Sequence, residues 1–229
     1  MKQYGVKVVQ EYPHSTDAYT QGLFFHNGTL YETTGQYGAS SIRTVALETG
    51  EPLVKKKLSR KYFGEGSVVL GEDLYILTWT NKVAFRYHAA TLEYKSTVAY
   101  PREGWGLTTD GHQLIASDGS ATLYFMDANL NVQRRLKVSL NGRPLRNLNE
   151  LEWIDGKIWA NVYLTDTIVI INPSSGVVEA VVDCRGLLPA KLRSAQTDVL
   201  NGIAQDADGR IYLTGKLWPK LYQIELVKK

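Results

Sequence analysis

The most prominent candidate for chemistry is Glu65, a carboxylate that stands between two glycines in the stretch YFGEGS. The residues that follow it, VVLGEDLYILTW, are mostly strand formers. A carboxylate at the start of such a strand can take up and return a proton, or it can be an ordinary solvated residue at a strand edge. The residues at equivalent positions elsewhere in the chain distinguish these two interpretations.

Five segments of the chain repeat one pattern of strand, glycine-containing turn and strand. Their first residues are 44, 40, 44 and 52 positions apart, a spacing typical of β-propeller repeats. A second pair of short apolar runs follows downstream, so each unit is expected to contain four strands. The segments are QGLFFHNGTLY from Gln21, EGSVVLGEDLY from Glu65, WGLTTDGHQLI from Trp105, NELEWIDGKIW from Asn149 and NGIAQDADGRIY from Asn201.

These repeats predict an all-β fold, namely a five-bladed β-propeller with four-stranded antiparallel blades. The fifth unit, from about Asp198 to Leu226, lacks a fourth strand of its own. We therefore expect the N-terminal strand, around Tyr4 to Val9, to close the ring. Residues 1–229 would then form a single propeller domain. A β-sandwich or a barrel also has many short strands, but neither predicts five in-phase copies of one hairpin.

Function is expected where the repeats differ and hold chemically capable side chains. The first residues of the five hairpins form one such set, which should converge at one mouth of the fold. A second set stands five residues after the Leu or Ile of each second strand, and antiparallel pairing should place its members beside the first set. The expected neighbours are Gln21 and Gly35, Glu65 and Trp79, Trp105 and Gly119, Asn149 and Tyr163, and Asn201 and Lys216.

Glu65 is the only carboxylate in these two sets. A carboxylate, a lysine and several amides between aromatic walls suit a small polar amide, a sugar or a peptide terminus. The glycines opposite Gln21 and Trp105 are expected to leave room for something to enter. The residue types thus predict a pocket, but they do not name a reaction.

Composition limits the classes of protein and partner. The 26 basic and 23 acidic residues give a formal charge of +3, and the one compact basic run, Lys55 to Lys57, is too small for a nucleic-acid footprint. A single cysteine, Cys184, excludes an internal disulfide, and the four histidines lack metal-ligand spacing. No apolar stretch is long enough to span a bilayer. We expect a monomer with no metal, no nucleic-acid partner and no membrane partner.

Several motifs resemble those of the plant and bacterial glutaminyl-peptide cyclotransferases, the metal-independent glutaminyl cyclases. The resemblance runs from Tyr12 to about Leu226. It implies a five-bladed propeller that converts the N-terminal glutamine of peptides or proteins to pyroglutamate with release of ammonia, and that needs no cofactor. The motifs are YPHSTDAYTQGL, YETTGQYG, YFGEG, LTW, GWGLTTDG, SDGSATL, LNELEW, ANVYLTDT, VLNGIA and TGKLWPKLY.

The resemblance also implies an exported protein, periplasmic or secreted. The opening MKQYGVKVVQEY, however, has no apolar core of a signal peptide. The sequence therefore leaves a cytoplasmic location open.

The resemblance implies a role for individual residues. Glu65 of YFGEG corresponds to the family's catalytic acid/base, and Asn149 and Lys216 assist the reaction centre. Tyr163 and Tyr19 stand where the usual sequence motifs of the family have tryptophan and phenylalanine, respectively. Both positions remain aromatic, which predicts a changed substrate preference rather than lost activity. The other predicted substrate-binding residues are Gln21, Phe63, Trp79 and Trp105, together with Asn201 from the first set.

The main hypothesis is therefore cyclisation by general acid/base catalysis without metal. Glu65 would accept a proton from the substrate ammonium group and return it to the departing nitrogen, while Lys216 or Asn149 donates to the oxyanion or orients the substrate amide. Two alternatives stay open. One is a propeller that binds peptides or sugars without chemistry. The other is a calcium-dependent hydrolase of the lactonase kind, but the single carboxylate Glu65 supplies too few ligands for a calcium ion.

Overall fold

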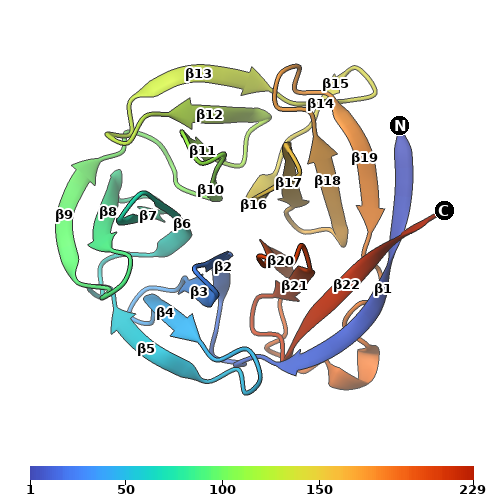
Figure 1. The fold of residues 1–229 in the computed structure, drawn as a ribbon, viewed down its shortest axis with the longest axis horizontal. Helices are drawn as coiled ribbons and strands as arrows, with labels where there is room; N and C mark the ends of the chain where they lie inside the picture. The colour runs from blue at the N-terminus through green and yellow to red at the C-terminus, as the bar shows by residue number, and fades with distance from the viewer.

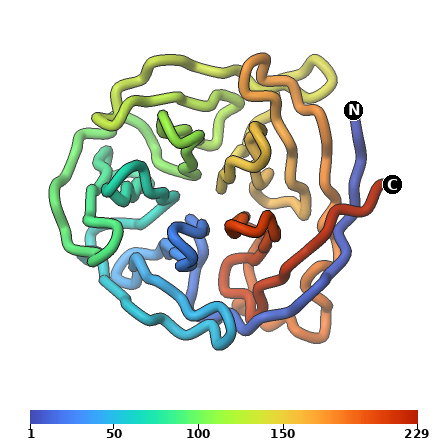
Figure 2. Tube along the Cα trace, viewed as in Figure 1, coloured from blue at the N-terminus to red at the C-terminus, as the bar shows by residue number.

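The computed structural model describes residues 1–229, and nearly all of its regular elements are β-strands. The sheets stand around a central axis, with the first strand of each repeat nearest the axis and the last at the rim (Figure 1). Figure 2 shows that the chain travels once around this axis and that the two termini end on the same side of the molecule. The structure contains no helix with the length and apolar character needed to cross a membrane.

The first three repeats each form a separate four-stranded antiparallel sheet with its strands in chain order. Their inner strands are buried, and their outermost strands are largely exposed because only one side of each packs on the protein. The strands are β2 Thr20–His26, β3 Thr29–Thr34, β4 Ser41–Val45, β5 Pro52–Lys57, β6 Gly64–Leu70, β7 Asp73–Thr78, β8 Val83–His88, β9 Tyr94–Ala99, β10 Leu107–Thr109, β11 Leu114–Ala116, β12 Thr122–Met126 and β13 Val132–Lys137.

The last two repeats form one eight-stranded sheet. A small hairpin, β14 Ser139–Leu140 and β15 Arg143–Pro144, precedes β16 in the chain, and a short 3-10 helix, Ala190–Leu192, lies in the connection before β20. The strands of the sheet, in spatial order, are β16 Leu148–Ile154, β17 Lys157–Val162, β18 Thr167–Ile171, β19 Val178–Asp183, β1 Lys2–Pro13, β22 Lys220–Lys228, β21 Ile211–Gly215 and β20 Leu200–Gln205.

The fold is all-β, and the N-terminal strand does pair with the last strand of the fifth repeat, but the expectation of five separate four-stranded blades is wrong. Strand β1 is longer than expected and pairs on both of its edges. It is antiparallel to β22 from Tyr4 to Pro13, and its first residues, Lys2 to Gly5, run parallel to β19. An unpaired strand edge is available for pairing with any strand that reaches it. Because β1 reaches the edge of β19, it joins the fourth and fifth repeats into a single sheet.

A buried ion pair fixes the chain just after β1. His14 Nε2 lies 2.6 Å from Glu32 Oε2 on β3, and His14 Nδ1 lies 2.6 Å from the Trp218 carbonyl oxygen. Burial disfavours the charged ring, but Glu32 and the Trp218 carbonyl outweigh burial and raise the pKa of His14. With both ring nitrogens donating, His14 links the N-terminal segment to the first sheet and to the connection before β22.

The apolar core consists of clusters that combine side chains from neighbouring repeats. Its largest cluster contains fifteen buried residues from the last two repeats, among them Trp159, Trp218 and Tyr222. Burying apolar surface contributes roughly 25 cal/mol per Å². The inner strands are therefore held rigidly, and they can present side chains at fixed positions near the axis.

Candidate active site

A cavity of about 200 Å³ lies where the inner strands of the repeats approach one another. Nine of the ten side chains predicted for the site line it, and Gln36 joins them. The tenth predicted residue, Asn201, lies behind this lining, where its Nδ2 donates to the Thr20 carbonyl at 2.9 Å and to Gln21 Oε1 at 3.3 Å. The lining consists of Tyr19, Gln21, Gln36, Phe63, Glu65, Trp79, Trp105, Asn149, Tyr163 and Lys216.

A β-bulge occurs at the start of four inner strands, at the first position of the repeat. On β6, Gly64 pairs with Thr78 and Ser67 with Ile76, so Glu65 and Gly66 together oppose a single residue. The register also shifts at Gln21 on β2, at Asn149 on β16 and at Asn201 on β20. Bulges bend a strand and re-aim its side chains. The bulges therefore explain how four different strands direct polar side chains toward one end of the axis.

Gly66 is required for the bulge beside Glu65. Its N–H donates to the Trp105 carbonyl oxygen at 2.6 Å. A Cβ at this position would lie 2.5 Å from the Leu107 amide nitrogen, a distance that real Cβ atoms do not show. The absence of a side chain thus lets the strand that carries Glu65 approach the strand that carries Trp105.

Four members of the second predicted set lie opposite partners two positions earlier in the chain than expected, namely Gly35, Trp79, Tyr163 and Lys216. The Trp79 N–H donates to the Phe63 carbonyl at 3.1 Å, and the Lys216 N–H donates to the Val199 carbonyl at 2.9 Å. The difference has two causes. Pairing of Glu65 with Trp79 would need a three-residue turn, but Leu70 pairs with Asp73, so the turn between β6 and β7 contains two residues. The bulge takes up one further position.

The two glycines of the second set do not leave room for a ligand. A Cβ on Gly119 would lie 2.6 Å from Trp105 Cζ2, and a Cβ on Gly35 would overlap the Phe63 ring. Gly119 also has a φ of 79°, a conformation that favours glycine. These glycines therefore make space for the aromatic walls of the cavity.

The aromatic side chains form two groups. The Phe63 ring packs edge-on against Trp79, with centroids 5.5 Å apart, and against Tyr19 at 6.0 Å. The Trp105 and Tyr163 rings pack edge-on with centroids 5.4 Å apart. Such contacts stabilise ring positions beyond simple area burial, so the cavity has two preformed apolar walls.

Glu65 and Lys216 are the two ionisable groups of opposite charge in the lining. The Glu65 side chain is almost fully buried, and this burial raises its pKa well above the ordinary value, with Lys216 acting in the opposite direction and Glu103 adding to the rise. Burial lowers the pKa of Lys216, while Glu65 and Asp198 oppose that change. Both groups are therefore displaced toward neutral pH, where a proton can be exchanged with least cost.

Lys216 lies between two tyrosine rings. Its Nζ is 4.5 Å from the centroid of Tyr19 and 4.8 Å from that of Tyr163. A cation over an aromatic face is attracted by the negative potential of the ring. The tyrosines therefore hold the ammonium group in place and compensate part of its lost hydration.

Asn149 contributes an amide without a partner inside the protein. Its side chain is buried, and Oδ1 has no hydrogen-bond partner. A buried polar atom left unpaired costs free energy. The Asn149 amide is thus available to a ligand that enters the cavity.

Three site residues were not predicted from the sequence. Gln36 lines the cavity with a φ of 93°, which is a strained conformation for a residue other than glycine. Glu103 accepts hydrogen bonds from both wall tryptophans, and Asp198 acts electrostatically on Lys216. All three lie in connections or near strand ends outside the two repeat positions that were compared, although the nearness of Glu103 to Trp105 in sequence was an available signal.

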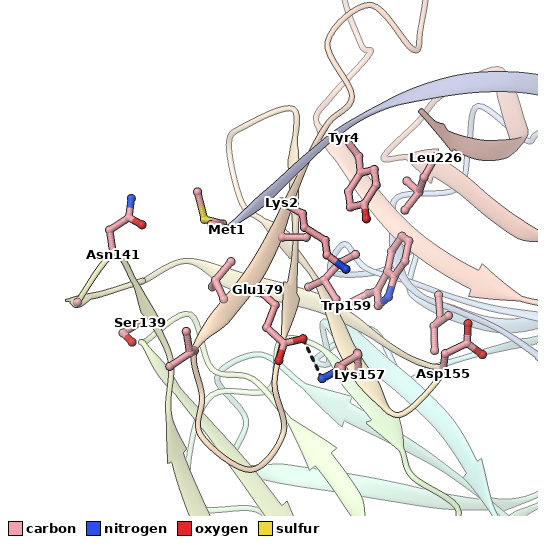
Figure 3. Close-up of a pocket in the computed structure, with 16 residues that line it drawn as sticks. Met1, Lys2, Tyr4, Ser139, Asn141, Asp155, Lys157, Trp159, Glu179 and Leu226 are labelled. Carbon is pink, nitrogen blue, oxygen red and sulfur yellow. Dashed lines mark ion pairs between the residues drawn. The ribbon is translucent and has the colours of Figure 1, made fainter. Parts of the chain in front are cut away.

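No group of three or more His, Cys, Asp or Glu side chains lies close enough together to hold a metal ion. A second, larger cavity of about 1010 Å³ lies beside the segment where the first residues of β1 pair with β19. Figure 3 shows its lining, with Tyr4, Trp159 and Leu226 on one side and an ion pair between Lys157 and Glu179 at 2.8 Å. It contains none of the residues predicted for the site.

Comparisons with known proteins place this geometry in a family. The model of the glutamine cyclotransferase family matches residues 1–226. A glutaminyl-peptide cyclotransferase of Arabidopsis thaliana is 45% identical over 227 residues, which cover 96% of this chain and 71% of that protein. The crystal structure of Myxococcus xanthus glutaminyl cyclase is similar with a TM-score of 0.93 at 35% identity, covering 100% of this chain and 99% of the other. The chain therefore belongs to the glutamine cyclotransferase family.

Proposed function

We propose that this chain is a glutaminyl-peptide cyclotransferase, which converts the N-terminal glutamine of peptides to pyroglutamate and releases ammonia in the cavity around Glu65. One observation supports this proposal above all: a buried carboxylate and a buried ammonium group share a small cavity with aromatic walls. Family membership gives the reaction class, and the cavity supplies groups suited to each of its steps.

The size of the cavity matches a single residue of substrate. Its volume of about 200 Å³ is below the roughly 300–1,000 Å³ of sites that take drug-sized ligands. One glutaminyl side chain folded back on its own α-amine fits such a space, and the rest of the peptide extends outward. Holding that folded conformer brings the amine to the side-chain carbonyl and removes much of the entropic barrier to ring closure.

Glu65 is proposed to transfer the proton. The α-nitrogen forms a bond to the side-chain carbonyl carbon, and Glu65 accepts the proton that this nitrogen loses. It then delivers the proton to the amide nitrogen, so that the carbon–nitrogen bond breaks with ammonia rather than an amide anion as the leaving group. The raised pKa of Glu65 makes the carboxyl group effective in both directions.

Lys216 and Asn149 are proposed to stabilise and orient the reacting amide. Negative charge develops on the carbonyl oxygen in the tetrahedral intermediate, and a fixed buried donor lowers the energy of that state. The Lys216 ammonium group is held between Tyr19 and Tyr163 for this purpose. The unpaired Asn149 Oδ1 is available to an N–H of the substrate.

The remaining lining residues are proposed to bind the substrate and exclude water. Phe63 and Trp79 form one wall, and Trp105 and Tyr163 form the other. Gln21 forms the polar floor, and Asn201 supports its amide from behind the lining. Exclusion of water strengthens the interaction between the charged groups and the reacting atoms.

We also infer that the reaction needs no metal ion, because an ammonium group already supplies positive charge inside the cavity and would repel a second cation. The ten lining residues come from positions between Tyr19 and Lys216, which supports a single domain spanning residues 1–229. We also propose an active monomer, which gel filtration would test. The proposed partners are peptides or proteins that begin with glutamine, without nucleic acid or membrane. The family resemblance favours an exported enzyme, which cell fractionation would test.

The direct test is to incubate the protein with short peptides that begin with glutamine, with and without a strong chelator, and to measure ammonia and pyroglutamyl product. We expect equal amounts of both products, at the same rate in chelator. A folded protein that binds these peptides but releases no ammonia would instead favour the binding-protein alternative, and loss of activity in chelator would contradict the metal-free mechanism.

A further inference from the structure

Glu103 connects the two aromatic walls through a single oxygen atom. Trp79 Nε1 donates to Glu103 Oε2 at 3.1 Å, and Trp105 Nε1 donates to the same oxygen at 3.0 Å. An indole N–H can only donate, and a carboxylate oxygen can accept two such bonds. Hydrogen bonds to a charged acceptor are also stronger than neutral ones. Two tryptophans from different repeats are thus held at one point.

The backbone around Glu103 is fixed. The Gly104 N–H donates to the Thr78 carbonyl at 2.9 Å, and a Cβ on Gly104 would lie 2.5 Å from Leu77 Cβ. On the other side, the Arg102 guanidinium lies 4.9 Å from the Tyr100 ring centroid. The segment therefore has little freedom to shift, and the carboxylate is a fixed anchor for the two indoles.

Trp79 depends on this anchor more than Trp105 does. The Trp79 side chain is 38% exposed, and its packing contact in the cavity is an edge-on one with Phe63. Trp105 is held additionally by the Tyr163 ring and by the space that Gly119 leaves. A half-exposed ring with one packed edge can rotate unless a directional bond fixes it.

We propose that Glu103 is a positioning residue, which sets the width of the substrate cavity by holding Trp79 and Trp105 at a fixed separation. The consequence for the proposed reaction is geometric. If the indoles separate, the glutaminyl side chain is no longer confined to the folded conformer, and water enters. A small misplacement of reacting groups costs up to about 100-fold in rate.

Glu103 has a second, electrostatic effect on the site. The charged and titratable groups that act on or with Glu65 are Lys216, Glu103, Tyr19 and Tyr163, while Asp198 acts on Lys216 and the tyrosines. After burial, Lys216 lowers the pKa of Glu65 and Glu103 raises it. Removing the Glu103 charge should therefore lower the pKa of Glu65 and move the acid limb of the rate profile to lower pH.

Two substitutions separate these effects. Glu103→Gln keeps an oxygen that can accept both indole bonds and removes the charge, whereas Glu103→Ala removes both. Glu93→Gln, at an exposed position in the turn between β8 and β9, makes the same change of charge away from the cavity and serves as the control. The measurements are tryptophan fluorescence, urea unfolding, and kcat and KM for a glutaminyl peptide across pH.

We expect Glu103→Ala to shift the tryptophan emission to longer wavelength and to lower kcat/KM about 10- to 100-fold. Glu103→Gln should keep the wild-type emission and most of kcat/KM, with its acid limb at lower pH than in wild type and in Glu93→Gln. Wild-type emission and kcat/KM in a folded Glu103→Ala would overturn the proposal. If the alanine variant does not fold, an emission shift or a 10-fold loss in Glu103→Gln would overturn it.

This inference rests on the proposed function only for its kinetic part. A wild-type protein that releases no ammonia would refute the proposed function, yet the fluorescence comparison between the alanine and glutamine variants would still test the positioning role. The two failures are therefore distinguishable.

Discussion

The ammonium nitrogen of Lys216 lies 4.5 Å from the centre of the Tyr19 ring, inside the cavity that also contains the Glu65 carboxylate. Two opposite charges, both removed from water, thus share a space sized for one substrate residue. Lys216 lowers the pKa of Glu65, and Glu65 raises the pKa of Lys216, so each group favours the charged form of the other against the effect of burial. This coupling leads to the first two predictions.

Lys216→Met should lower kcat about 100- to 1,000-fold, because methionine keeps much of the side-chain length but cannot donate to the oxyanion. Removing the positive charge should also raise the pKa of Glu65, so the acid limb of the residual activity should move to higher pH. Rate profiles for this variant and for Lys220→Met, a partly exposed lysine near Glu11, provide the comparison. Unchanged kcat in Lys216→Met would rule out the proposed role of Lys216.

The wild-type rate should fall on both sides of neutral pH. Glu65 must be ionised to accept a proton, and its pKa is raised from 4.5, so activity should be lost on acidification well above pH 4.5. Lys216 must be charged, and its pKa is lowered from 10.5. As pH rises, activity should therefore be lost already at a pH below 10.5. The profile of kcat/KM reports these groups in the free enzyme. An acid limb at the ordinary value for glutamate would contradict this assignment.

Gly119→Ala should weaken substrate binding in addition to the loss of folding free energy that its backbone strain causes. An added Cβ would lie 2.6 Å from Trp105 Cζ2, whereas Gly142 has nearly the same φ, 77° against 79°, with open space around it. Each substitution should cost roughly 1–2 kcal/mol of folding free energy from the left-handed conformation. Only Gly119→Ala should also raise KM, by about 10-fold or more. Equal KM values in the two variants would show that the Trp105 position does not depend on Gly119.

His14→Ala should destabilise the fold by about 3–5 kcal/mol, because it leaves the Glu32 carboxylate buried without its partner. Burial opposes ionisation of Glu32, but His14, together with Arg43 and Thr20, outweighs burial and lowers the pKa of Glu32 below 4.5, while the pKa of His14 is raised above 6.5. The contribution of the pair is therefore complete between these two values. It is lost as pH rises through the folded-state pKa of His14 and as pH falls through that of Glu32.

Urea unfolding of the His14→Ala, Glu32→Ala and double variants measures this pair. The double variant should lose less free energy than the sum of the single variants, since it leaves no unpaired charge. Strict additivity would indicate that the two side chains do not interact in solution.

The repeats predicted most of the cavity lining, and the family resemblance added Tyr19 and Phe63. The first residues of the hairpins lie near the same end of the axis. Comparing equivalent positions of the repeats was therefore enough to assign Gln21, Glu65 and Asn149 to one site. The register was less predictable. Bulges beside residues such as Glu65 depend on how closely two strands approach, and a glycine in the sequence does not by itself indicate which pairing will shift.

The additional pairing of β1 with β19 could not be predicted for a different reason. An alternating segment such as Tyr4 to Val9 can add to any free strand edge, and its sequence does not show that the edge of β19 is within reach. Glu103 was missed because its role depends on two indoles that come together only in the folded chain. Residues in connections carry no repeat signal, so their contacts follow from tertiary structure alone.

The central claim is that Glu65 transfers the proton, and the most direct test is the rate of pyroglutamate formation by Glu65→Gln at saturating glutaminyl peptide. Glutamine preserves the shape of the side chain but cannot take up the proton, so we expect kcat to fall by about 100- to 10,000-fold, with unchanged unfolding and retained peptide binding measured by tryptophan fluorescence. A folded Glu65→Gln variant with wild-type kcat would contradict the account.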